Sequence, residues 1–215
     1  MTLKQLTTIL TFIVFTTLSH AQNDILECGS TYYSEDYNPV IVKSISELPA
    51  NIQDSVKSHL LNKLGNDFYA LLIFENGLII DYQELVRQDP KVLNYQWQIP
   101  KYDLGFYITQ KQAGINYCCS RMTLDSTGAI INKINFPDYK INAQSIKFTD
   151  LTQIKKASKK LGFDPENYVI DFMDDHIVLK FTRVKKYEYI EYLCISAHSG
   201  EKVRQYKVTG IIDWF

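Results

Sequence analysis

Two short turns in the C-terminal third of the chain hold the residues best suited to chemistry. Asp174, Asp175 and His176 are consecutive, and His198 lies in a second turn just before Gly200. Carboxylates and imidazoles can together ligate a divalent metal, and histidine can also act as a pH-sensitive contact. The alternative is that both segments are ordinary solvated turns, which often use such polar residues. The sequence leaves both interpretations open.

The segment 150–210 predicts the elements that position these turns. Residues 150–161 have the apolar spacing of one helix, which Gly162 ends. The pattern then changes to the alternation typical of strands, and four strands in sequence predict an antiparallel meander. The first and third turns of a meander lie at the same end of the sheet, so we expect His198 to approach the 174–176 turn. The predicted strands are 168–172, 177–184, 187–196 and 202–208.

The third of these strands supplies a predicted binding surface. Its alternate residues share one face of the sheet. If the helix covers one face, the other exposes apolar and aromatic side chains of the kind that bind a partner. The alternative is that the two halves of the chain cover each other. The residues predicted to bind are Tyr189, Glu191, Leu193 and Ile195.

The segment 46–145 follows the same plan with an insertion. It opens with a helix at 46–65, and residues 84–100 interrupt the later strands as a loop or short helix. When Gly128 is placed on Gly200, both segments read as strand, short turn ending in glycine, and strand. The predicted strands are 68–74, 78–82, 104–110, 115–124 and 129–136, with a tight turn at 75–77 and an irregular lead-in at 22–45 that includes a short strand at 40–42.

The expected fold class is therefore α+β. It consists of two tandem units, 46–145 and 146–215, each a helix followed by an antiparallel β-meander. In each unit the apolar stripe of the helix is expected to cover one face of the sheet.

The closing hairpins of these units carry a family resemblance. Residues 194–203 and 125–128 fit a pattern of aliphatic strand residues followed by a turn that ends in Ser/Thr-Gly, although Ala197 stands where the family often has Asp. A Leu-Pro pair at 48–49 opens a helix ahead of the Phe-x-Asn-Gly run at 74–77. In these features the chain resembles PepSY-like domain proteins exported by Bacteroidetes-type bacteria, which resemble β-lactamase inhibitory protein in their tandem repeats. The resemblance implies a non-enzymatic, protein-binding or inhibitory role and supplies no catalytic residue.

Residues 1–21 predict a secretory signal peptide. The apolar run 6–18 is too short to cross a bilayer, and small residues up to Ala21 favour cleavage before Gln22. The alternative is a short membrane anchor. We expect an exported chain, periplasmic or extracellular, with no membrane span after cleavage.

The cysteines are expected to form one structural disulfide, because bonds of this kind persist outside the cytosol. Cys118 and Cys119 are adjacent in a strand-like run, so their side chains point to opposite faces and do not readily bond to each other. The predicted bond joins Cys28 to one of these two. The alternative is that Cys194 and one member of the pair are small buried hydrophobes. The sequence does not choose among the possible pairings.

Composition and motifs narrow the function classes. The chain has 23 basic and 24 acidic residues, so its charge gives no drive toward nucleic acid. It has no phosphate-cradling glycine loop, dinucleotide fingerprint or nucleophile–base motif, so we expect no cofactor and no catalysis. The predicted function is an exported binding module with a protein partner, as an inhibitor or regulator of an envelope hydrolase. The alternatives are a small envelope enzyme and an outer-membrane β-barrel.

Overall fold

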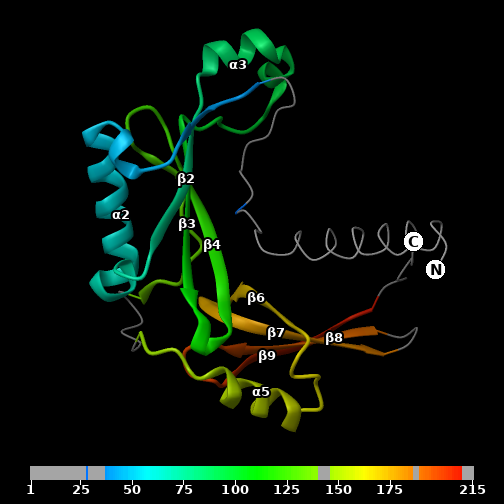
Figure 1. Cartoon of the computed structure of the whole chain (residues 1–215). Coiled ribbons are helices and arrows are strands. Elements are labelled where there is room, and N and C mark those ends of the chain that lie inside the picture. Colours follow the sequence, from blue (N-terminus) through cyan, green and yellow to red (C-terminus); the bar gives the residue numbers. More distant parts are fainter. Residues whose placement is uncertain (1–27, 29–36, 140–145, 186–188, 210–215) are drawn as a thin grey trace, which may run out of the picture.

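The protein is an α+β structure built on two antiparallel sheets (Figure 1). The computed structural model describes residues 28, 37–139, 146–185 and 189–209. The α+β class expected from the sequence is confirmed, whereas the predicted signal peptide lies outside these residues. None of the helices in the described ranges is long and apolar enough to cross a bilayer.

One sheet has five strands in the order β1-β2-β3-β4-β5. Helix α2 (Ala50–Tyr69) runs along one of its faces (Figure 1). The helix begins after a short 3-10 turn, η1 (Ile45–Glu47), in which Ser44 and Glu47 cap each other's backbone. The buried stripe of α2 recurs every fourth residue and consists of Ile52, Val56, Leu60, Leu64 and Phe68. The strands are β1 (Val40–Val42), β2 (Ile73–Ile79), β3 (Tyr102–Gln110), β4 (Ile115–Leu124) and β5 (Ile130–Asn132).

Gly65 kinks α2 instead of ending it. Its φ of 69° is left-handed, a conformation that suits glycine, and the helix resumes beyond it. This continuation brings Phe68 onto the buried stripe, where its ring stacks on Tyr139 with centroids 4.4 Å apart. The predicted strand 68–74 is therefore wrong in its first part, because core packing of Phe68 outweighs the local stop signal.

Residues 75–77 lie inside β2 and do not form the predicted hairpin turn. The strand pairs with β1 on one side and β3 on the other, with a register irregularity between Phe74 and Asn76. A Cβ at Gly77 would stand 2.7 Å from Cδ2 of Leu104, so the glycine permits close packing against β3. The Asn-Gly pair therefore lies in an irregular part of β2, and the predicted turn is wrong.

The predicted insertion 84–100 corresponds to an excursion between β2 and β3. It contains α3 (Tyr82–Gln88) and the 3-10 helix η2 (Pro90–Asn94). Asp81 caps α3 by accepting hydrogen bonds from two backbone N–H groups of its first turn. A small separate cluster of buried side chains holds the excursion and consists of Tyr37, Ile80, Leu85 and Val92.

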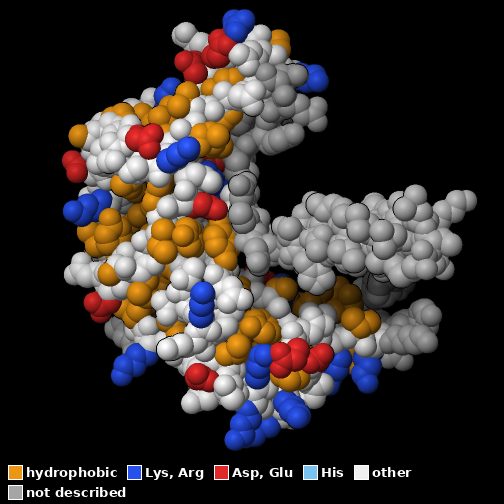
Figure 2. All heavy atoms as spheres, viewed as in Figure 1, with side chains coloured by type: hydrophobic (Ala, Val, Ile, Leu, Met, Phe, Trp, Pro, Cys, Tyr) orange, Lys and Arg blue, Asp and Glu red, His pale blue; other side chains and the backbone are white. Residues whose placement is uncertain are grey.

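The other sheet has four strands in the order β6-β7-β8-β9, as the predicted meander requires. Helix α5 (Leu151–Lys160) precedes it, with Asp150 accepting from the N–H of Thr152 at its start. Figure 2 shows Lys and Arg side chains gathered at the α5 end of the molecule, where the last helical turn carries Lys159 and Lys160. The strands are β6 (Tyr168–Met173), β7 (His176–Lys185), β8 (Tyr189–Ser196) and β9 (Lys202–Val208).

One hydrophobic core joins the two sheets. Phe136, which follows β5, contacts Phe172 of β6 with ring centroids 5.4 Å apart. The connection between β3 and β4, which includes η3 (Lys111–Ala113), packs against α5: a Cβ at Gly114 would lie 2.6 Å from Cδ1 of Leu151. The two halves of the chain therefore cover each other in part, which was the alternative to a free sheet face.

A disulfide joins Cys28 to Cys119 of β4, which is one of the two predicted links. Cys118 and Cys194 are free and buried. Burial raises the pKa of the Cys118 thiol to about 12, so it stays protonated and unreactive in the native fold.

Candidate functional site

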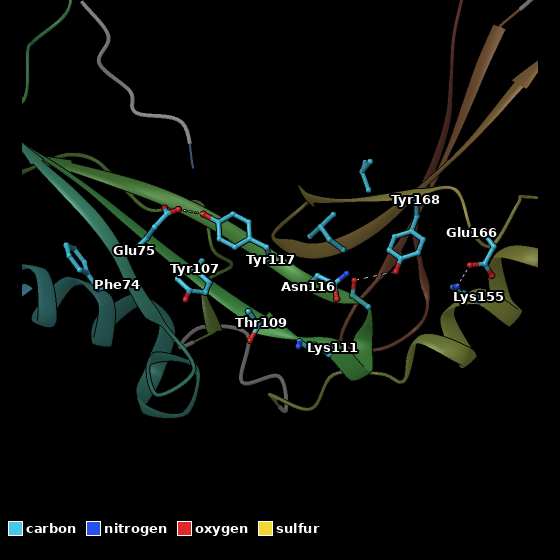
Figure 3. Close-up of a pocket in the computed structure, with 13 residues that line it drawn as sticks. Phe74, Glu75, Tyr107, Thr109, Lys111, Asn116, Tyr117, Lys155, Glu166 and Tyr168 are labelled. Carbon is cyan, nitrogen blue, oxygen red and sulfur yellow. Dashed lines mark hydrogen bonds and ion pairs between the residues drawn. The ribbon is translucent and has the colours of Figure 1, made fainter. Parts of the chain in front are cut away.

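An open groove of about 1080 Å³ lies where the two sheets meet (Figure 3). Strands β2, β3 and β4 provide its floor, while α5, the segment after it and β6 provide its wall. Aromatic rings, hydroxyl and amide groups and charged side chains all line it. The lining residues that matter most below are Glu75, Tyr107, Tyr117, Lys111, Tyr168 and Ile170.

The alternation of strand residues places two tyrosines side by side on the floor. Phe106 and Ile108 are buried in the core on the α2 side, so Tyr107 between them points to the opposite face. Tyr117 of β4 lies beside it, with ring centroids 5.1 Å apart. The floor thus presents an aromatic surface of the kind that anchors binding partners.

The Tyr117 hydroxyl connects the groove to the disulfide. It donates to the Glu75 carboxylate and accepts from the backbone N–H of Cys28 at 3.2 Å. Burial, together with the nearby carboxylate, raises the pKa of Tyr117 well above its ordinary value, so the hydroxyl remains a donor. The second carboxylate oxygen of Glu75 is buried and has no hydrogen-bond partner among the described residues.

The wall of the groove is held by an ion pair and a tyrosine. Lys155 of α5 pairs with Glu166, and its ammonium group lies 5.9 Å from the centre of the Tyr168 ring. The Tyr168 hydroxyl donates to the carbonyl of Gly114 at 3.4 Å. These contacts fix the first residues of β6 against the connection between β3 and β4 (Figure 3).

A buried ion pair lies near the Glu75 end of the floor. Arg121 Nε donates to Asp103 Oδ1 at 2.7 Å, and the same guanidinium donates to Asn76 Oδ1 at 3.0 Å and to the carbonyl of Cys28 at 3.1 Å. Gly105 makes room for it, because a Cβ there would be 2.7 Å from Nη1 of Arg121. The network joins β2, β3, β4 and Cys28 into one unit.

The two turns predicted to hold a metal lie at the same end of the four-stranded sheet, as expected. Asp174 pairs with Arg204 at 3.0 Å, and Asp175 accepts from the backbone N–H of Asp138 at 3.0 Å. Nδ1 of His176 is buried and has no hydrogen-bond partner among the described residues. His198 contacts the Tyr139 hydroxyl through Nε2 at 2.6 Å. Over the part of the chain that the structure describes, no group of three or more His, Cys, Asp or Glu side chains could hold a metal ion, and the cluster that includes His176 is no exception.

We expect His198 to make the free energy of unfolding fall in mildly acidic solution. Burial lowers its pKa below 6.5. The hydrogen bond to the Lys147 carbonyl opposes this shift, and the charge of His176 adds a smaller lowering. The unfolded chain binds a proton near pH 6.5 and the folded chain only at lower pH, so stability falls as pH drops from about 6.5 toward the folded pKa. The expected slope is at most about 1.4 kcal/mol per pH unit for one proton.

Urea unfolding at about pH 7.5 and about pH 5.5 checks this expectation, with His198→Gln as the comparison. The pKa of His59 is also lowered by burial, so the difference between wild type and variant isolates the His198 contribution. An identical loss of stability in both proteins would contradict the assignment.

The predicted binding surface on β8 is corrected by its burial. Leu193 and Ile195 are fully buried in the core, and Glu191 is bound by Arg183 and by Gln205 at 2.9 Å. Tyr189 is partly covered by the Lys207 ammonium, 4.4 Å from its ring centre. This face packs toward α5 and the shared core, so it does not offer a surface for a partner.

The sequence interpretation did not identify the groove residues. Tyr107 and Tyr117 belong to strands that were predicted, but their meeting with Tyr168 depends on how the two sheets pack. Glu75 was predicted to lie in a turn, so its position in a strand on the floor of the groove was not expected. Only the alternation of Tyr107 with buried Phe106 and Ile108 could have marked an outward-facing tyrosine.

Comparisons with protein-family models, with curated proteins and with solved structures found no match. The function is therefore inferred from the chemistry of the groove.

Proposed function

We propose that the protein is an exported, non-catalytic binding module that holds a protein partner in the groove between its two sheets. The partner class is an envelope hydrolase, which the module inhibits or regulates. The observation that carries the proposal is the open groove with Tyr107 and Tyr117 paired on its floor and Tyr168 on its wall. Tyrosine-rich concave surfaces of this kind are typical of protein recognition.

The proposal includes two tandem PepSY-like units. It is supported by α2 preceding β2 to β5 and α5 preceding β6 to β9, and by the two turn glycines, Gly128 and Gly200, which both have positive φ. Each turn is also tied to its helix in a similar way. Ser55 of α2 donates to the carbonyl of Gly128 at 2.6 Å, and Thr149, just before α5, donates to the carbonyl of His198 at 2.6 Å.

The charged groups of the groove favour recognition. The Glu75 carboxylate accepts from Tyr117, and Glu166 is paired with Lys155, so both acids already hold fixed positions. Groups of this kind orient a bound partner and select it by charge.

Two exposed valines on the outer face of the four-stranded sheet provide a matched test. Val169 lines the groove and is 55% exposed, whereas Val184 is 51% exposed and is not among the residues that line it. We expect the mature chain and Val184→Lys to retain the same discrete protein from the envelope fraction of the producing organism. Val169→Lys should lose it, because the ammonium group would enter the interface without a partner.

Equal thermal stability of the two variants is the control. Retention of the same protein by all three chains would contradict the groove as the binding surface. Turnover of an envelope substrate by the mature chain alone would contradict a non-catalytic role.

A further inference from the structure

Strand β6 is an edge strand, and its free edge borders the groove. It pairs with β7 on one side, and no described strand pairs with its other side. Tyr168, Val169 and Ile170 at its start all line the groove. We infer that the partner enters the groove as an extended peptide that adds to β6 as a fifth strand. The inference rests on the protein-binding function proposed above and specifies its mode.

The hairpin geometry identifies the backbone groups that are available. The turn between β6 and β7 has two residues, Asp174 and Asp175, both with positive φ, which is the two-residue hairpin closed by a hydrogen-bonded pair. That pair is Met173 and His176, so alternation gives Val169 and Asp171 inward bonds to β7. The N–H and C=O groups of the residues between them point to the free edge.

Two residues therefore offer a complete set of edge groups within the groove, Tyr168 and Ile170. Beyond them the edge is closed, because the Phe172 N–H donates to the Asp171 carboxylate at 2.8 Å. Unpaired N–H and C=O groups in a row match only an extended backbone, whereas a sugar or a helical ligand cannot satisfy them in register. The tyrosines of the floor then contact alternate side chains of the added strand.

The charge around this edge selects the side chains of the peptide. Lys155 is held by Glu166, whereas Lys111 takes part in none of the ion pairs of the described residues. Lys111 is the first residue of η3, and Gly114 follows the last; the Gly114 carbonyl accepts from the Tyr168 hydroxyl. The groove lining as a whole holds two acids and two lysines, but Lys111 is the lining lysine without an ion-pair partner among the described residues. The added strand should therefore place an acidic side chain opposite Lys111.

The test uses a phage-displayed library of random linear peptides selected on the mature chain, followed by synthetic copies of the selected peptides. We expect acidic, β-prone sequences. N-methylation at every second peptide residue should weaken binding by about tenfold per site, since each removes one ladder bond, and N-methylation of the residues between should have little effect. Peptide binding should slow hydrogen exchange at Tyr168 and Ile170 and leave Val169 and Asp171 unchanged. These measurements use the unaltered protein.

Lys111→Gln, an exposed substitution, should weaken binding of the selected peptides by about three- to fivefold. Lys91→Gln, on η2 away from the groove, is the matched control and should leave peptide binding unchanged. The inference is overturned if N-methylation shows no alternation, if exchange slows elsewhere, or if only oligosaccharides bind. Binding that appears only after removal of residues 22–27 would also overturn it, because the chain's own N-terminal segment would then be the occupant. If Val169→Lys abolishes capture of a protein partner while N-methylation shows no alternation, the proposed function stands and strand addition fails.

Discussion

Replacing Arg121 with methionine is expected to destabilise the protein by about 3–5 kcal/mol, the range measured when one partner of a buried ion pair is removed. The carboxylate of Asp103 is fully buried and accepts from the Arg121 Nε–H, so the variant removes the positive charge that faces this buried carboxylate. The guanidinium also holds Asn76 and the carbonyl of Cys28, and these bonds are lost too. Chemical denaturation of the purified mature chain measures the change.

The matched control is Arg204→Met. Arg204 pairs with Asp174, and both side chains are about half exposed, so the loss should lie within about 1 kcal/mol. The double variant Arg121→Met/Asp103→Leu should recover much of the stability, because it removes both buried charges together. If Arg121→Met proves no more costly than Arg204→Met, the network does not hold the sheet together as described.

The four-stranded half could be predicted from the sequence because its signals are local. Asp150 and Gly162 bound a helix, and short turns separate strands that pair with their sequence neighbours. The first half was harder, because its sheet is interrupted by α3 and η2. Gly65 predicts the end of a helix, and the Asn76-Gly77 pair predicts a turn. In the structure α2 continues past Gly65 and the pair lies within β2, because packing against residues distant in the sequence outweighs these local preferences.

The groove could not be predicted for the same physical reason. It arises where β4 meets β6. The contact that fixes this meeting, between Tyr168 and Gly114, joins the first strand of the four-stranded sheet to the connection between β3 and β4. The predicted face of β8 was chosen by alternation alone, which identifies a face but not which face the helix covers. The hydrophobic character of Leu193 and Ile195, offered as a binding feature, was the mark of the core.

Removing the disulfide should have an effect of similar size. The bond joins residues 91 apart in sequence, and the loop-closure model gives about 4–5 kcal/mol for a loop of this length. We expect Cys28→Ser/Cys119→Ser to lower the free energy of unfolding by about 3–5 kcal/mol, with native-state contacts of Cys28 included. The N–H of Cys28 bonds to Tyr117 and its carbonyl to Arg121, so the loss should extend to the floor of the groove.

Thiol counting gives the control. In denaturant without reductant the wild type should expose two reactive thiols, Cys118 and Cys194, whereas the native protein should expose none because both are buried.

Combining the serine pair with Arg121→Met should lower the free energy of unfolding by less than the sum of the separate losses, since Cys28 and Arg121 share a hydrogen bond. Full additivity would mean that the disulfide and the buried ion pair act independently, and the groove floor would then lack the single network on which its rigidity depends.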